Sequence, residues 1–167
     1  MKNLLFTLAL LISFNSFTQK TADDFFNRAY DKAEMGDYYG AISDYIKVIE
    51  IEPNAADAYA NIGAAKNSLE DYYGAISDFN KAIEINPKEI NAYFGRAVSK
   101  RRLKDYYGAI SDYNKVIELN PKYIGAYANR GVAKQLLGDL NGACNDWEKA
   151  TQLGSRKTAK WIFEYCN

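Results

Sequence analysis

The chain has 167 residues, with 21 basic and 21 acidic side chains, no histidine and 48% hydrophobic residues. That length suits one domain, and the hydrophobic content is too high for a disordered chain. The absence of histidine excludes Ser-His-Asp and Cys-His catalysis and removes the commonest metal ligand, while the balanced charge gives no global attraction to nucleic acid.

The amino terminus has the pattern of a secretory signal peptide at residues 1–18. A positively charged start precedes an apolar run at residues 4–14, and Ser16 and Thr18 are small residues at the spacing that signal peptidase requires. The run is shorter than the ~20 apolar residues of a membrane-spanning helix, and no later segment is long enough. We therefore predict cleavage before Gln19 and a secreted or periplasmic protein. The alternative is an uncleaved helix packed on the domain.

A repeat of 34 residues organises the rest of the chain. The segment Asp-Tyr-Tyr-Gly-Ala-Ile-Ser-Asp-Tyr at residues 37–45 recurs at 71–79, with Phe as its last residue, and unchanged at 105–113. A weaker copy occupies 139–147. Repeats at such a period indicate a stack of similar supersecondary units. The repeat units are residues 22–55, 56–89, 90–123 and 124–157.

Each unit is predicted to form two helices joined by a turn. Apolar residues recur at spacings of three and four on both sides of the turn, as in amphipathic helices. Asp71 can cap the start of the second helix, and Pro87 ends it. Small residues recur where the two helices must approach closely. These are Ala29, Gly63, Ala97 and Gly131 on the first helix, and Ala41, Ala75, Ala109 and Ala143 on the second.

The four units resemble the tetratricopeptide repeat family in period and in the order of motif positions. Each opens with an aromatic residue, continues with the small–small pair and a second aromatic, and the first three close with proline; the fourth has Ser155 instead. Another departure is Arg28, Ile62, Arg96 and Arg130 where the family has leucine. The resemblance implies an all-α fold: a right-handed α-solenoid of four helix-turn-helix units, forming a domain at residues 19–157. Residues 158–167 are expected to form a capping helix.

Two columns of charged residues recur with the repeat. An aspartate on each second helix lies sixteen residues after the arginine column, so we predict the structural pairs Arg28–Asp44, Arg96–Asp112 and Arg130–Asp146. Repeat two has Ile62 and Asp78 at these positions, so it lacks the arginine. A lysine column was expected to be solvated surface. It comprises Lys32, Lys66, Lys100 and Lys134.

The resemblance implies a concave face lined by the first helices, and this face is the candidate binding site for a peptide or partner protein. An asparagine that recurs there (Asn27, Asn61, Asn129) can clamp a peptide backbone in related proteins, because an amide both donates and accepts. The alternative is a surface asparagine without a partner. The candidate contact residues are Phe26, Asn27, Tyr30, Asn61, Asn91, Phe94, Val98, Arg101, Arg102 and Asn129.

Some family members grip a carboxy-terminal peptide with a set of lysine, asparagine and arginine residues. At the corresponding positions this chain has Phe26, Tyr30, Asn61, Asn91 and Gly95, and only Asn61 matches. That activity is therefore not predicted.

Two further surface patterns accompany the repeat. Tyr39, Tyr73 and Tyr107 form a ladder that is either a second binding surface or a product of duplication. Repeats one and two have net charges of −5 and −3, and repeats three and four of +4 and +2. This polarity can steer a partner, or a second copy of the chain, unless it is accidental.

The cysteines lie at the carboxyl end. Ala159, Ile162, Phe163 and Cys166 are expected on the packed side of the capping helix. Cys144 lies on the second helix of the last unit, so we predict a Cys144–Cys166 disulfide in an oxidising compartment. The alternative is two buried free thiols.

These features favour a non-catalytic protein–protein interaction scaffold in the cell envelope that binds a peptide or protein. The alternative is a constitutive structural subunit of an envelope assembly. An enzyme is disfavoured because no glycine-rich phosphate loop or metal-ligand cluster occurs, although lone carboxylates can do acid–base chemistry. No cofactor, nucleic acid or membrane span is predicted.

Overall fold

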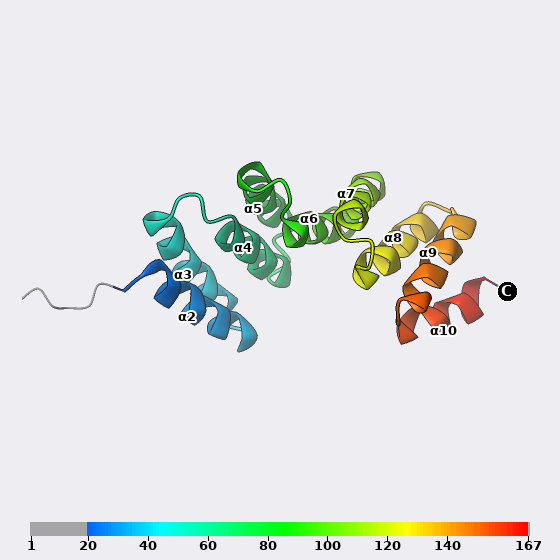
Figure 1. The fold of residues 1–167 in the computed structure, drawn as a ribbon, viewed down its shortest axis with the longest axis horizontal. Coiled ribbons are helices and arrows are strands. Elements are labelled where there is room, and N and C mark those ends of the chain that lie inside the picture. Colours follow the sequence, from blue (N-terminus) through cyan, green and yellow to red (C-terminus); the bar gives the residue numbers. More distant parts are fainter. Residues whose placement is uncertain (1–19, 167) are drawn as a thin grey trace, which may run out of the picture.

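The structure, a computed structural model, describes residues 20–166 and contains only helices within them (Figure 1). Successive antiparallel pairs stack side by side from the amino to the carboxyl end, giving the predicted right-handed α-solenoid. The helices are α2 (Ala22–Glu34), α3 (Tyr38–Ile51), α4 (Ala56–Ser68), α5 (Tyr72–Ile85), α6 (Ile90–Arg102), α7 (Tyr106–Leu119), α8 (Ile124–Leu136), α9 (Leu140–Gln152) and α10 (Arg156–Tyr165). The predicted signal peptide lies outside the described residues.

The recurring Asp-x-x-Gly motif starts the second helix of every pair. In α5 the backbone N–H of Gly74 donates to the Asp71 carboxylate at 3.0 Å, as predicted for a helix cap. A Cβ on Gly74 would lie only 2.1 Å from the Asp71 Oδ2 atom, so a larger residue would displace the cap. The same bond forms at Gly40, Gly108 and Gly142.

The predicted small residues are buried where paired helices cross. The alanines of this set are fully buried. A Cβ on Gly131 of α8 would lie 2.5 Å from Nε1 of Trp147 and 3.1 Å from the Ala143 carbonyl oxygen of α9. The indole N–H of Trp147 donates to the Ala128 carbonyl at 3.2 Å, which holds the ring in this position. Close approach of the two helices therefore requires glycine here.

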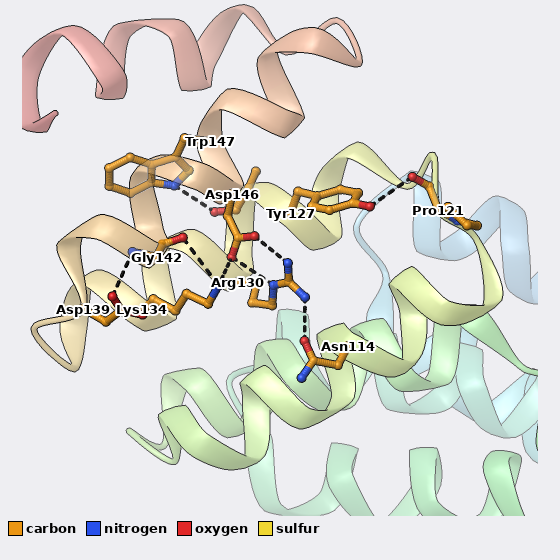
Figure 2. Close-up of polar contacts among 10 residues, drawn as sticks. Asn114, Pro121, Tyr127, Arg130, Lys134, Asp139, Gly142, Asp146 and Trp147 are labelled. Carbon is orange, nitrogen blue, oxygen red and sulfur yellow. Dashed lines mark hydrogen bonds and ion pairs between the residues drawn. The ribbon is translucent and has the colours of Figure 1, made fainter.

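The three predicted arginine–aspartate pairs form within hairpins, and two of them also connect neighbouring repeats. Around the buried Asp146, Arg130 donates to both carboxylate oxygens, and its remaining Nη1 donates to Asn114 Oδ1 of the preceding repeat at 2.6 Å (Figure 2). Arg96 likewise joins Asp112 to Asn80. Bidentate pairing satisfies a buried carboxylate and orients the guanidinium toward the preceding repeat.

The expectation that the lysine column is solvated surface was wrong. Lys134 Nζ lies 2.8 Å from the second oxygen of Asp146, and Lys66 lies 2.7 Å from Asp78. Lys32 and Lys100 pair with their aspartates in the same way. The lysine lies four residues after the arginine, so both cations occupy one helix face and reach the same carboxylate.

Repeat two has the weakest of these networks. Ile62 replaces the arginine and is buried, so Lys66 is the one basic side chain within ion-pair distance of Asp78 among the described residues. Burial raises the pKa of Asp78, and Lys66 only partly offsets this. Asp112 and Asp146 each pair with two cations, and Asp44 pairs with three.

The helix α10 covers the carboxyl end of the stack with only part of the predicted face, since Ile162 and Cys166 are half-buried as expected. Ala159 is exposed, and Phe163 exposes 82% of its surface. Trp161 and Tyr165 instead pack against Trp147, and their ring centroids lie 5.4 and 6.0 Å from the Trp147 ring centroid, respectively. The helix begins at Arg156, capped by Ser155, and the wide aromatic rings rather than the smaller apolar residues determine its rotation on α9.

A disulfide joins Cys144 on α9 to Cys166, the residue after α10, with Cα atoms 5.9 Å apart. The Thr151 and Thr158 hydroxyls form a second link between the two helices at 2.8 Å. Both connections lie on the side of α10 that faces α9. Together with the aromatic contacts, they place the capping helix in one defined position.

Candidate functional site

A groove of about 750 Å³ runs over the first helices of repeats one to three. It lies between α2, α4 and α6. Its lining consists of Phe26, Tyr30, Asp57, Ala60, Asn61, Ala64, Asn67, Phe79, Glu89, Asn91, Phe94, Gly95 and Val98.

Two phenylalanines form the apolar walls of the groove. The Phe26 ring of α2 packs edge-on against buried Tyr45 at 5.2 Å. The Phe94 ring of α6 contacts Tyr113 and Tyr123 at 5.8 and 5.1 Å. These contacts restrict the rings from behind while they remain only half-buried. Preordered aromatic surface can bury an apolar side chain of a ligand at low entropic cost.

The groove floor is formed where α4 and α6 come together. The Asn67 side-chain amide donates to the Gly95 carbonyl at 3.2 Å, and the Ser99 hydroxyl donates to Asn67 Oδ1 at 2.7 Å. The buried Phe79 ring lies against Gly95, where a Cβ would approach its Cζ atom to 2.2 Å. Gly95 therefore allows the ring to fill the space beneath the groove, which explains its departure from the recurring asparagine.

Carboxylates of Asp57 and Glu89 occupy one end of the groove. Asp57 lies in the first turn of α4, and Glu89 caps the start of α6 by accepting the backbone N–H of Asn91 at 3.3 Å. Burial raises the pKa of Glu89, and the neighbouring Asp57 carboxylate raises it further. The two groups are close enough to interact directly.

Six of the ten candidate contact residues line this groove. They are Phe26, Tyr30, Asn61, Asn91, Phe94 and Val98. The other four lie elsewhere. Asn27 and Arg102 are exposed outside the groove, and Arg101 is half-buried but does not line it. Asn129 donates to the Gly125 carbonyl of its own helix at 2.8 Å, so its amide is already engaged.

Sequence reasoning missed Asn67 and Glu89. Asn67 lies seven residues after Ala60 and three after Ala64, two groove-lining residues, so helical periodicity places it on the same face. Glu89 precedes a helix rather than lying on one, so no helical periodicity indicates it. Its position as the capping residue of α6 was the available signal.

Comparison with known families identifies the repeat. The family model described as tetratricopeptide repeat matches residues 56–89 and 90–123, and a second, described as TPR repeat, matches residues 29–68. The chain belongs to the tetratricopeptide repeat family. The two models together extend over residues 29–123 and so include the whole α4–α6 part of the groove. No curated protein matches the chain.

Solved structures share the solenoid fold. One neighbour, the crystal structure of MamA, is 22% identical, with a TM-score of 0.75 over 91% of this chain and 86% of that one. MamA from Desulfovibrio magneticus RS-1 is 20% identical, with a TM-score of 0.72 over 79% and 75%. The first TPR of Spaghetti (RPAP3), bound to the HSP90 peptide SRMEEVD, is 26% identical, with a TM-score of 0.69 over 71% and 94%.

Other surfaces of this tetratricopeptide repeat protein lie outside the groove. The ladder tyrosines Tyr39, Tyr73 and Tyr107 occupy one position on α3, α5 and α7, and each exposes 76% of its surface. None of the helices within residues 20–166 has the length and hydropathy needed to cross a membrane.

Proposed function

We propose that this protein binds an extended peptide segment of a partner protein in the groove between α2, α4 and α6. The observation that carries the proposal is the groove itself: half-buried rings of Phe26 and Phe94 flank the Asn61 amide on one continuous surface. An aromatic wall can bury ligand side chains while an amide hydrogen-bonds the ligand backbone. The peptide-bound RPAP3 neighbour supports peptide binding by this fold.

The function that we infer is binding without chemistry. The groove lining consists of aromatic, aliphatic and amide side chains, apart from the Asp57–Glu89 pair. Tyr30 lines the groove and Tyr45 packs against Phe26. Burial raises the pKa of Tyr45 to about 12, which leaves its hydroxyl protonated at neutral pH. A scaffold role requires nothing further from these residues.

We place this function in the cell envelope, on the signal pattern at residues 1–18 and on the cysteine pair. Cys144 and Cys166 are the two cysteines of the chain, and their bond would persist in an oxidising compartment. Mass spectrometry of protein purified from its native host should give a mature amino terminus at Gln19. An intact Met1 in the major species would exclude this processing.

The groove is tested by selecting a random dodecapeptide phage library on the purified protein. Enriched peptides should bind about thirtyfold more weakly to Asn61→Ala/Phe94→Ala, because a hot-spot pair contributes about 2 kcal/mol or more. Asn129→Ala is the matched control, since that amide bonds to its own helix outside the groove. Circular dichroism must show unchanged helicity, and Asn61→Ala alone preserves the test if loss of Phe94 weakens packing.

Two results would contradict the groove proposal. One is a library from which no peptide is enriched over an uncoated surface. The other is enriched peptides that bind the folded double variant as well as the original protein. Either would move the binding site to another surface.

The alternative function is a constitutive subunit of an envelope assembly, and the exposed tyrosine ladder favours it. Three identical rings at equivalent positions give a regular surface that a rigid partner can cover. The opposed charges of the two halves would also let copies of the chain associate head to tail. Pull-down from envelope extract distinguishes these functions: a subunit remains bound in fixed stoichiometry, whereas a peptide ligand exchanges. Sedimentation at low and high salt tests self-association.

A further inference from the structure

The amino-terminal end of the groove is bordered by acidic residues from three separate segments. A second hollow of about 510 Å³ adjoins the groove and shares Phe26 and Asp57 with it. Asp23 of α2 and Glu52 after α3 line this second hollow, while Glu89 lines the first. Neither lining includes a lysine or an arginine. The surface that a ligand would meet here is therefore negatively charged.

These acidic residues have no cationic partner among residues 20–166. The ion pairs of the described chain involve the recurring aspartates and the two pairs Lys81–Glu84 and Lys115–Glu118, and none includes Asp57 or Glu89. Asp112, by contrast, is paired with both Arg96 and Lys100. Cations on the same helices, such as Lys66 of α4 and Lys100 of α6, pair with the recurring aspartates instead.

The Asp57–Glu89 pair works against folding stability. Glu89 is partly buried beside a second carboxylate, and both effects raise its pKa because they disfavour the charged form. Its orientation is held by the Asn91 backbone N–H and by the Asn86 side-chain amide, each at 3.3 Å. A cation placed between the two carboxylates would relieve their repulsion and supply the missing counter-charge.

We propose that the groove selects peptides in which a lysine or arginine side chain lies beside an apolar side chain. The cationic group binds between Asp57 and Glu89, and the apolar side chain packs between Phe26 and Phe94. This inference rests on the proposed peptide-binding function and specifies its ligand. The charge preference is opposite to that expected for an acidic carboxy-terminal peptide, for which the groove offers no basic side chain.

An aromatic ring at the acidic end strengthens the preference for a cation. Phe26 lines both hollows next to Asp57, so a guanidinium or ammonium group between the carboxylates can also approach its ring face. Cations over aromatic rings are stabilised by the ring quadrupole, more so when partly desolvated. The chain itself shows such contacts, with the Arg28 guanidinium 5.1 Å from the centre of the Phe25 ring.

The same dodecapeptide phage library tests this inference through the composition of the selected peptides. Lysine and arginine should be enriched next to an apolar residue, and aspartate and glutamate should be depleted. For a synthetic copy of the most enriched peptide, Asp57→Asn/Glu89→Gln should weaken binding about tenfold, since charge pairs at a half-buried interface are worth that much or more. Replacing the basic residue of the peptide by glutamine should have a similar effect.

A matched control removes two acidic charges away from the groove. Glu50 and Glu70 are exposed and lie outside both hollows, so Glu50→Gln/Glu70→Gln gives the same change in net charge. This variant should bind the peptide as the original protein does. Equal weakening by both double variants would mean that the effect is one of overall charge and would overturn the proposed position of the cation.

The remaining outcomes separate this inference from the function on which it rests. If peptides are enriched but carry no basic residue, or carry acidic ones, the groove binds peptides and the charge preference is wrong. If no peptide is enriched, the peptide-binding function itself fails. If the Asp57→Asn/Glu89→Gln variant binds the basic peptide undiminished, the two carboxylates are not the recognition site.

Discussion

The Cys144–Cys166 bond should decide whether helix α10 stays docked on α9. The perturbation is the double substitution Cys144→Ser/Cys166→Ser, or reduction of the original protein. Without the bond, α10 is held by the contacts of Trp161 and Tyr165 with Trp147 and by the threonine hydroxyl pair. Among the described helices, this ten-residue helix packs mainly against α9, so its docking depends largely on these contacts.

The size of the effect follows from the loop that the bond closes. The cysteines are 22 residues apart, and closing a loop of that length restricts the unfolded chain by about 3 kcal/mol. Each aromatic contact adds about 1 kcal/mol beyond burial, and a hydroxyl hydrogen bond a similar amount. The bond therefore contributes as much as the remaining specific contacts together, and its loss should lower the stability of the α9–α10 region by about 3 kcal/mol.

Tryptophan fluorescence reports on this region alone. The chain has two tryptophans, Trp147 and Trp161, and their rings lie 5.4 Å apart at the junction of α9 and α10. In urea titrations, fluorescence excited selectively in tryptophan follows the cap, whereas circular dichroism follows all helices. On reduction, the fluorescence transition should move to lower urea and separate from the circular dichroism transition, since the rest of the solenoid does not contain the bond.

Two outcomes would refute this reasoning. Titration of two free thiols in the denatured, unreduced protein would show that the bond does not form. Coincident fluorescence transitions with and without reductant would show that the bond forms but does not hold the cap. The serine double variant is the control for the reductant, because reduction should leave its transition unchanged.

Three further predictions concern the solenoid core, each measured by urea unfolding. Asp112→Asn should lower the free energy of unfolding by about 3 kcal/mol, because two part-buried cations lose their partner. Asp78→Asn should lower it by less than about 1 kcal/mol, because among the described residues only Lys66 pairs with Asp78 and burial already raises the pKa of that carboxyl. Equal losses of stability in the two variants would contradict the difference between the two ion-pair networks. Gly131→Ala should cost about 1–3 kcal/mol, since the new Cβ meets the Trp147 indole at 2.5 Å; an unchanged stability would show that α8 can move away. The Arg28 hydrogen bond lowers the pKa of Asp44, so its stabilisation is present above about pH 4 and is lost as pH falls below that. Asp44→Asn should therefore reduce stability near pH 7, and the variant should lose less stability than the original protein on acidification. Parallel profiles of stability against pH for the two proteins would contradict the pairing.

Much of the candidate groove could be predicted because its residues follow the helical period. Asn61 and Phe94 were placed on the concave face from their positions in the repeat, and both line the groove. Asn129 occupies the equivalent position but bonds to Gly125, a residue four positions earlier on its own helix. Equivalent positions in a repeat share a backbone location, while the neighbours that engage each side chain differ from unit to unit.

The lysine column shows a second limit of sequence reasoning. A lysine at each unit looks like solvated surface, because its long stem lets the charge reach water. Only the crossing angle of the paired helices brings Lys134 to the same carboxylate as Arg130. The rotation of α10 was missed for a related reason: the ring of Trp147 on α9 selects Trp161 and Tyr165 as its partners.

The sequence by itself determined the local structure and the repeating architecture. A period of 34 residues, an aspartate cap with its glycine, and small residues at the helix crossings specify hairpins that must stack, because each hairpin alone leaves an apolar face uncovered. The tertiary structure alone decided which charges are paired and which are left open. Glu89 comes close to Asp57 because α4 and α6 lie side by side, although the two residues are 32 positions apart in the chain. No local pattern encodes that meeting, since it depends on how neighbouring hairpins pack.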